Sequence, residues 1–298
     1  LLDHQPRRVV QEPKNMRDQI IFHKPAVAER RQGVSRQSLA TGLHTVLQNG
    51  LRRNELSVHY QPRIATKTAQ ISGCEALVRW HHPHLGLIEP ERFIPVAEET
   101  GMITELGEWV LFTALATQRQ WKEADLEPGI MAVNVSPRQL VDPAFGDMVE
   151  RLLDTTGVSP AEIELEITES TRLDNLDQVI RTMARLDKLG IKFAMDDFGA
   201  GYASLDYIRK LPVSSIKIDQ SFIRNIATNN RDALLVKSMV NMANDLGLKV
   251  VAEGIQDQNQ LEILRPMACD EFQGFLFSPP LTIDSATSLI SKAPGFAI

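Results

Sequence analysis

Short apolar runs alternate with longer amphipathic stretches along most of the chain. The short runs match strands in length and pattern, whereas in the longer stretches apolar residues recur every three or four positions, as on one face of a helix. The runs predict strands at residues 56–62, 71–80, 130–135, 163–168, 191–196, 215–219, 250–254 and 271–275. The amphipathic stretches predict helices from about Ser38 to Gly50 and at 105–122, 145–155, 176–189, 233–246 and 258–264. Glycines such as Gly190 and Gly247 directly follow predicted helices, as helix-ending residues do.

The order of these elements predicts an α/β fold. About eight strands connected by helices in some 250 residues are typical of a TIM-like (β/α)8 barrel. An open doubly wound sheet is the alternative, but no G-x-G-x-x-G motif follows the first predicted strand. The connection between strands 56–62 and 71–80 is too short for a parallel crossover. We therefore expect one strand of the barrel to be antiparallel.

Residues 1–37 differ from the rest of the chain. Segments 5–8 and 28–32 are polar and basic, and only residues 18–22 resemble a short strand. We interpret residues 1–37 as the tail of an upstream domain with a linker, and residues 38–298 as the barrel domain. The sequence starts with Leu1 rather than Met, so we expect it to be a piece of a longer protein.

Composition and charge narrow the class of protein. The chain has 298 residues, of which 43% are hydrophobic and 23% charged, as in soluble globular domains. Its net charge of -6 gives no basic field for a nucleic-acid polymer or an anionic membrane. No apolar run approaches the ~20 residues of a membrane span. Two cysteines are too few for a disulfide framework, which predicts a reducing cytoplasm; a membrane anchor outside this segment is compatible with that prediction.

Polar residues stand at the end of almost every predicted strand. In a barrel of this kind these ends meet at one rim, where catalytic groups lie. The residues are Glu75, Asn134, Glu166, Glu169, Asp196, Asp197, Lys217, Glu253 and Gln273. So many carboxylates would repel one another unless cations neutralised them, and oxygen ligands without His or Cys favour Mg²⁺ or Mn²⁺. Two such ions suit the hydrolysis of a phosphodiester, and the adjacent Asp196 and Asp197 are predicted to bind them.

Several motifs together resemble the EAL-domain cyclic di-GMP phosphodiesterases. The likeness extends from about Ser38 to Ile290, over the whole predicted barrel. It is carried by Glu75-Ala76-Leu77-Val78-Arg79-Trp80, Tyr60-Gln61-Pro62, Asn134-Val135-Ser136, Glu166-Ile167-Thr168-Glu169, Asp196-Asp197-Phe198-Gly199, Lys217-Ile218-Asp219, Ala252-Glu253-Gly254 and Gln273-Gly274-Phe275. Residues 22–31 more weakly resemble the end of a GGDEF domain that leads into an EAL domain.

The resemblance implies hydrolysis of cyclic di-GMP to linear pGpG with two metal ions. It implies that the metals are bound by Glu75, Asn134, Glu166, Asp196, Asp197 and Glu253. Lys217 would position the attacking water with Gln273 nearby, and Gln61 and Arg79 would hold the nucleotide. Glu169 would steady the loop after Asp197, which the family links to dimerisation and activity. A homodimer and an upstream regulatory domain are the expected protein partners.

The chain departs from the family pattern at a few positions. Gln256 stands where a Glu is usual, and the other departures are Ala200, Ala203, Ala268 and Pro279. Because Gln256 lacks a carboxylate, a second hypothesis is that the barrel binds cyclic di-GMP and signals without cleaving it. A third hypothesis is a metal-using barrel that acts on sugars, which requires that Gln61 and Arg79 do not bind a nucleotide.

Overall fold

The computed structural model describes residues 47–51, 53–168, 175–201, 205–292, 295–296 and 298. The predicted upstream segment, 1–37, and most of the first predicted helix lie outside the described residues. Residues 47–51 are helical, in agreement with the predicted end of that helix near Gly50. Among the described helices, none combines the length and the apolar character needed to cross a bilayer.

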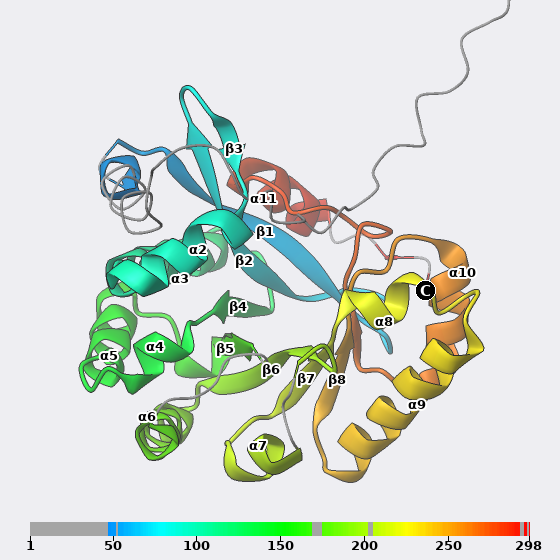
Figure 1. Cartoon of the computed structure of the whole chain (residues 1–298). Helices are drawn as coiled ribbons and strands as arrows, with labels where there is room; N and C mark the ends of the chain where they lie inside the picture. The colour runs from blue at the N-terminus through cyan, green and yellow to red at the C-terminus, as the bar shows by residue number, and fades with distance from the viewer. Residues whose placement is uncertain (1–46, 52, 169–174, 202–204, 293–294, 297) are drawn as a thin grey trace, which may run out of the picture.

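Eight strands close into a barrel with helices around it, as the sequence predicts (Figure 1). They are β1 (Leu56–Ala65), β2 (Ile71–His82), β4 (Ile130–Asn134), β5 (Ile163–Thr168), β6 (Lys192–Phe198), β7 (Ser215–Ile218), β8 (Lys249–Ala252) and β9 (Glu271–Phe272). Strand β1 runs antiparallel to both of its neighbours, β2 and β9, and so closes the barrel. The prediction of one antiparallel strand is confirmed.

Strand β2 continues beyond the barrel. Its barrel pairing with β4 ends at Ala76, and its last residues pair instead with β3 (Gly86–Ile88) in a hairpin outside the barrel (Figure 1). Glu75 therefore lies in the middle of a long strand, although it is at the end of the part that belongs to the barrel. The sequence did not predict β3, which has only three residues.

Helices surround the barrel (Figure 1). They are α2 (Pro90–Thr100), α3 (Ile103–Glu123), α4 (Pro137–Val141), α5 (Phe145–Thr156), α6 (Leu176–Leu189), α7 (Leu205–Lys210), α8 (Gln220–Arg224), α9 (Asn230–Asp245), α10 (Gln258–Leu264) and α11 (Ile283–Lys292), with 3₁₀ turns η1 (Pro160–Glu162) and η2 (Arg265–Met267). The five helices predicted after residue 100 are confirmed. In α6, Val179, Met183 and Leu186 bury one face, and Gly190 ends the helix at a φ of 111°.

The barrel interior is polar in two layers. In strands, residues two apart point to the same face. Along β1, β5 and β7, and at the end of β9, a polar residue of the rim is paired at this spacing with a polar residue one layer deeper. The pairs, rim residue first, are Gln61 and Arg63, Glu166 and Glu164, Lys217 and Ser215, and Gln273 and Glu271. The apolar residues between them, such as Leu165 and Ile216, are fully buried toward the helices.

Candidate active site

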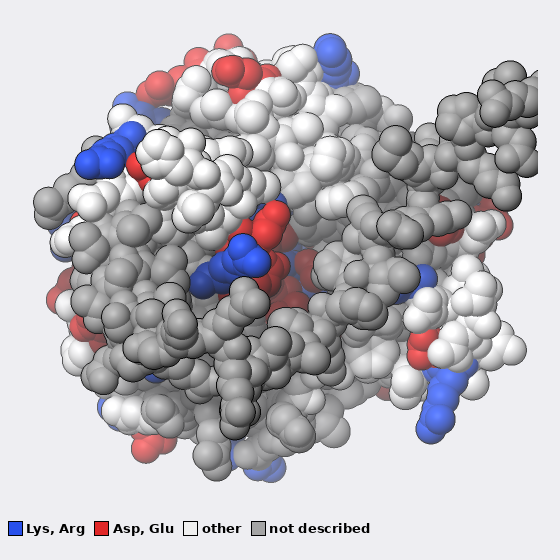
Figure 2. Space-filling model, turned by 45° about the horizontal axis from the view of Figure 1, so that its top comes forward, with Lys and Arg blue, Asp and Glu red and all other residues white. Residues whose placement is uncertain are grey.

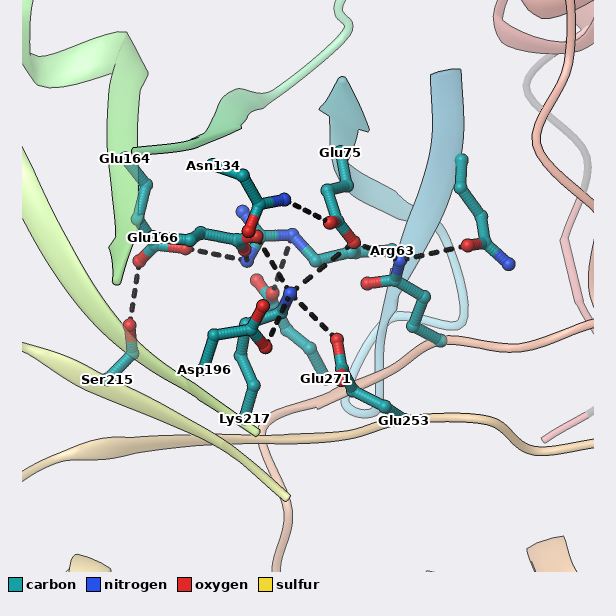
Figure 3. A network of polar contacts seen from close by, with 12 residues as sticks. Arg63, Glu75, Asn134, Glu164, Glu166, Asp196, Ser215, Lys217, Glu253 and Glu271 are labelled. Atoms are coloured by element: carbon teal, nitrogen blue, oxygen red, sulfur yellow. Dashed lines mark hydrogen bonds and ion pairs between the residues drawn. The ribbon is translucent and has the colours of Figure 1, made fainter. Parts of the chain in front are cut away.

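Lys217 is the central charge of the rim layer. Its side chain is 1% exposed, and its Nζ lies 2.8 Å from Glu166 Oε2 and 2.8 Å from Glu253 Oε1 (Figure 3). The same nitrogen is 3.1 Å from Asp196 Oδ1 and 3.4 Å from Glu75 Oε2. One buried ammonium therefore contacts carboxylates from four other strand ends, and it is the only cation that contacts this group within the described residues, apart from Arg63 beneath Glu166.

Glu75 is held by two amide donors, one at each oxygen of its carboxylate. Asn134 Nδ2 donates to Glu75 Oε1 at 2.7 Å, and Gln273 Nε2 donates to Glu75 Oε2 at 2.7 Å. Gln273 Nε2 also lies 3.2 Å from Gln61 Oε1, and Gln61 Nε2 donates to the Ser278 carbonyl at 3.1 Å. A chain of hydrogen bonds from Glu75 through Gln273 and Gln61 to the Ser278 carbonyl thus fixes the Glu75 carboxylate.

The adjacent acids Asp196 and Asp197 both belong to the site because the backbone is irregular there. Consecutive strand residues normally face opposite sides of a sheet. The pairing of β6 with β7 shifts register between Met195 and Phe198, and Asp197 has a left-handed φ of 53°. The Asp197 N–H donates to Asp196 Oδ1 at 3.0 Å. The kink therefore brings two neighbouring carboxylates to one cluster of acids.

The carboxylates form two groups with the dimensions of metal sites. Oxygen atoms of Glu75, Glu166 and Asp196 all lie within 4.8 Å of one another, and so do those of Asp196, Asp197 and Glu253. Asp196 is common to both groups. Glu166 Oε1 is buried without a hydrogen-bond partner in the described structure, as expected of an oxygen that is free to bind a cation. Buried, closely spaced carboxylate oxygens fit Mg²⁺ or Mn²⁺.

The pKa values of these acids reflect their crowding. Burial raises the pKa of Glu253 to about 8 against the attraction of Lys217, and burial together with Asp196 raises the pKa of Asp197 to about 6. Burial and the charge of Glu75 place the pKa of Glu166 well above its ordinary value. Burial would also raise the pKa of Glu75, but Lys217 and the two amide donors lower it to about 2. Without added cations, part of the cluster therefore holds protons near neutral pH.

The acids lie at the base of an open cavity of about 800 Å³. Arg79, Asp219, Gln256 and Phe275 line its walls, and Phe275 is 65% exposed. Figure 2 shows acidic and basic side chains together in a hollow of the visible face. The volume is in the range of small-molecule and cofactor sites. The cavity therefore has space for a ligand in contact with both the acids and Arg79.

The structure brings together all but one of the residues that the sequence predicts for the site. Glu75, Asn134, Glu166, Asp196, Asp197, Lys217, Glu253, Gln61 and Gln273 form one contiguous polar cluster, and Arg79 lines the same cavity. Glu169, expected to stabilise the loop after Asp197, lies outside the described residues.

Sequence reasoning missed the deeper layer of the interior. Arg63 Nη1 lies 2.6 Å from Glu164 Oε1, and Ser215 Oγ donates to Glu164 Oε2 at 2.8 Å. Glu271 Oε2 lies 3.6 Å from Arg63 Nε. The available signal was the spacing, because each of these residues stands two positions along the chain from a predicted site residue.

Comparison with known proteins identifies the family. The family model for the EAL domain matches residues 44–280. The cyclic di-GMP phosphodiesterase NbdA of Pseudomonas aeruginosa is 40% identical over 253 residues, which are 85% of this chain and 32% of NbdA. The bifunctional diguanylate cyclase/cyclic di-GMP phosphodiesterase MucR of the same species is 37% identical over 245 residues, 82% of this chain and 36% of MucR. The chain belongs to the EAL domain family.

A solved structure supports the same assignment. The PaMucR phosphodiesterase in complex with cyclic di-GMP superposes with a TM-score of 0.77 at 38% sequence identity, over 82% of this chain and 99% of that chain. The chain spans about a third of the length of the curated relatives that it matches. It is thus an EAL barrel with cyclic di-GMP phosphodiesterases among its relatives, and its carboxylates have the spacing that a metal site requires.

Proposed function

We propose that this chain hydrolyses one phosphodiester bond of cyclic di-GMP and releases linear pGpG, with two Mg²⁺ or Mn²⁺ ions as cofactors. The observation that carries the proposal is the charge of the rim cluster. Its carboxylates are those of Glu75, Glu166, Asp196, Asp197 and Glu253, and Lys217 supplies one positive charge among them. When all five acids are ionised, four negative charges remain uncompensated, which is the charge that two divalent cations neutralise.

The proposed metal ligands are the residues of the two overlapping groups, with Asn134 beside Glu75. Asp196, which belongs to both groups, is the proposed bridging ligand. Two bound divalent ions supply Lewis-acid activation of water and stabilisation of charge on the phosphate and the leaving oxygen. The protein contributes rigidity, because Glu75, Asn134 and Glu166 project from regularly paired parts of the barrel strands.

The remaining site residues are proposed to bind the substrate and to orient water. Arg79 lines the cavity and carries the planar guanidinium that can bind a phosphate through two parallel hydrogen bonds. Gln61 and Gln273 line the same cavity beside Glu75. Lys217 is proposed to orient the attacking water and to offset the negative charge that develops at the phosphate. Glu75 and Glu253, which flank Lys217, are proposed to fix its ammonium group.

A second candidate function is supported by Gln256. This residue lines the cavity, and its backbone N–H donates to Gln260 Oε1 at 2.7 Å. Its neutral amide stands where the resemblance leads one to expect a carboxylate, so the second candidate is a receptor that binds cyclic di-GMP without cleavage.

The length of the relatives supports a multidomain parent protein. NbdA and MucR are about three times as long as the segment matched, and MucR is named as both a cyclase and a phosphodiesterase. We therefore propose that residues 1–37 are the tail of an upstream, GGDEF-like regulatory domain and a linker. The homodimer and the cytoplasmic location stay predictions from the sequence.

The decisive experiment is incubation of the purified chain with cyclic di-GMP and Mg²⁺ or Mn²⁺, with and without EDTA, followed by chromatography. Metal-dependent formation of pGpG supports the enzyme, and binding without product supports the receptor.

Glu253→Ala should reduce hydrolysis by more than about 100-fold. It should leave the fold intact, because the raised pKa of Glu253, about 8, shows that its ionised form is unfavourable there. Glu262→Ala on the exposed surface of α10 is the matched control and should retain full activity.

A further inference from the structure

A buried ion-pair layer lies one step deeper in the barrel than the proposed metal ligands, and its residues are drawn together with them in Figure 3. Its centre is Arg63 from β1, whose side chain is 2% exposed. Arg63 contacts Glu164 of β5 at 2.6 Å and Glu271 of β9 at 3.6 Å, and Ser215 of β7 donates to the second oxygen of Glu164. Carboxylates of two other strands therefore flank the guanidinium, and Ser215 holds one of these carboxylates in place.

Glu166 lies between this layer and Lys217. Its Oε2 accepts a hydrogen bond from Lys217 Nζ at 2.8 Å. Its Oε1 is buried and has no hydrogen-bond partner in the described residues, and Arg63 Nη1 lies 3.7 Å from it. The carboxylate is thus held above by one cation and below by another, with its free oxygen between them.

We propose that Arg63 is a positioning residue that holds the Glu166 carboxylate in the orientation required for metal binding. The inference rests on the proposed metal-dependent function, and Arg63 contacts neither the cavity nor the other carboxylates of the rim. Groups behind metal ligands commonly orient them in this way. Glu164 and Glu271 in turn contact Arg63, and Ser215 holds Glu164, so the whole layer acts on the metal site through Glu166.

Charge and position make opposite predictions for the loss of Arg63. If Arg63 acted only as a charge, replacing it with a neutral residue would make the site more negative and would tighten the binding of a divalent cation. If Arg63 acts by position, Glu166 loses its lower support and the cation is bound more weakly. The direction of the change in affinity therefore distinguishes the two roles.

The test measures Mn²⁺ binding by isothermal titration calorimetry in the absence of nucleotide. Arg63→Met, a neutral residue of similar length, should weaken Mn²⁺ affinity by about 10–100-fold. Arg63→Met combined with Glu164→Gln removes the carboxylate that the first substitution leaves unpaired, and it should show the same loss. Arg63→Lys restores a charge without the planar fork and should recover part of the affinity. Thermal unfolding of each variant in EDTA checks that the barrel is folded; the double variant decides the test when the single one does not fold.

Unchanged or tighter Mn²⁺ binding in the folded Met variants overturns the proposal. Full recovery in the double variant also overturns it, because the unpaired Glu164 would then have caused the loss. The proposed function fails separately: wild-type chain that binds Mn²⁺ but releases no pGpG leaves the role of Arg63 standing. Wild-type chain that binds no Mn²⁺ overturns both.

Discussion

Lys217→Met is expected to destabilise the metal-free barrel and to be partly rescued by metal. The lysine is 1% exposed and contacts four carboxylates at 2.8–3.4 Å, so its removal leaves buried acids without their cation. Removing one partner from a buried ion pair typically costs about 3–5 kcal/mol.

The lowered pKa of Glu75 gives the scale of the stabilisation that Lys217 and the two amide donors supply together. Burial would raise this pKa, but Lys217 and the amide donors lower it from 4.5 to about 2. At about 1.36 kcal/mol per pKa unit, the difference corresponds to roughly 3 kcal/mol of folding free energy. Because the folded pKa is the lower one, this contribution is complete above about pH 4.5 and is lost as the pH falls toward 2. The experiment therefore belongs near neutral pH.

The assay is urea unfolding in EDTA near neutral pH, repeated in saturating Mn²⁺. In EDTA the free energy of unfolding of Lys217→Met should fall by about 3–5 kcal/mol relative to the wild type. In Mn²⁺ the bound ions replace the missing positive charge, so the deficit should shrink by at least about 1 kcal/mol. Lys249→Met, at an exposed position on β8, is the control and should change stability by less than about 0.5 kcal/mol in both conditions.

Either of two results would refute this reasoning. If Lys217→Met unfolds within about 0.5 kcal/mol of the wild type in EDTA, the lysine does not neutralise the cluster. If the deficit is the same with and without Mn²⁺, the metal ions do not act on the carboxylates that Lys217 contacts.

Three further predictions concern pH, backbone strain and close packing. Burial raises the pKa values of Glu253 and Asp197 to about 8 and about 6, so Mn²⁺ must displace the protons that these acids hold. The affinity for Mn²⁺ should therefore rise between about pH 6 and 8 and then level off. Calorimetry in buffers of different ionisation enthalpy measures the released protons, and an affinity that does not change with pH contradicts the assignment. Ala268 is exposed and has a left-handed φ of 58°, a conformation that costs alanine about 1–2 kcal/mol and glycine almost nothing. Ala268→Gly should therefore stabilise the chain by about 0.5–1 kcal/mol in urea unfolding, despite the greater entropy of glycine in the unfolded chain. A loss of stability would contradict this prediction. A Cβ at Gly199, where φ is 97°, would lie 2.7 Å from the ring of Phe222. Gly199→Ala should therefore lower the free energy of unfolding by about 1–3 kcal/mol and reduce hydrolysis. Wild-type activity and stability in this variant would be the contrary result.

The irregular end of β6 shows how far local sequence can lead. The adjacent Asp196 and Asp197 before a glycine predict a metal site, and the structure places both carboxylates in one cluster. The left-handed conformation of Asp197 and the register shift that make this possible depend on the pairing of β6 with β7. A local pattern names the ligand types, but the neighbouring strand decides where they point.

The sequence by itself determined the strand and helix alternation, the presence of one antiparallel strand and the residues of the rim. These depend on hydrophobic period, connection length and residue chemistry, which are all local properties of a chain. Only the tertiary structure decided which charges pair. Gln61 and Gln273 are 212 positions apart, and Arg63 and Glu164 are 101 apart, yet each pair is in contact inside the barrel. Such pairings follow from the closure and register of eight strands, which place side chains two positions apart on each strand into common layers, and no local pattern specifies that register.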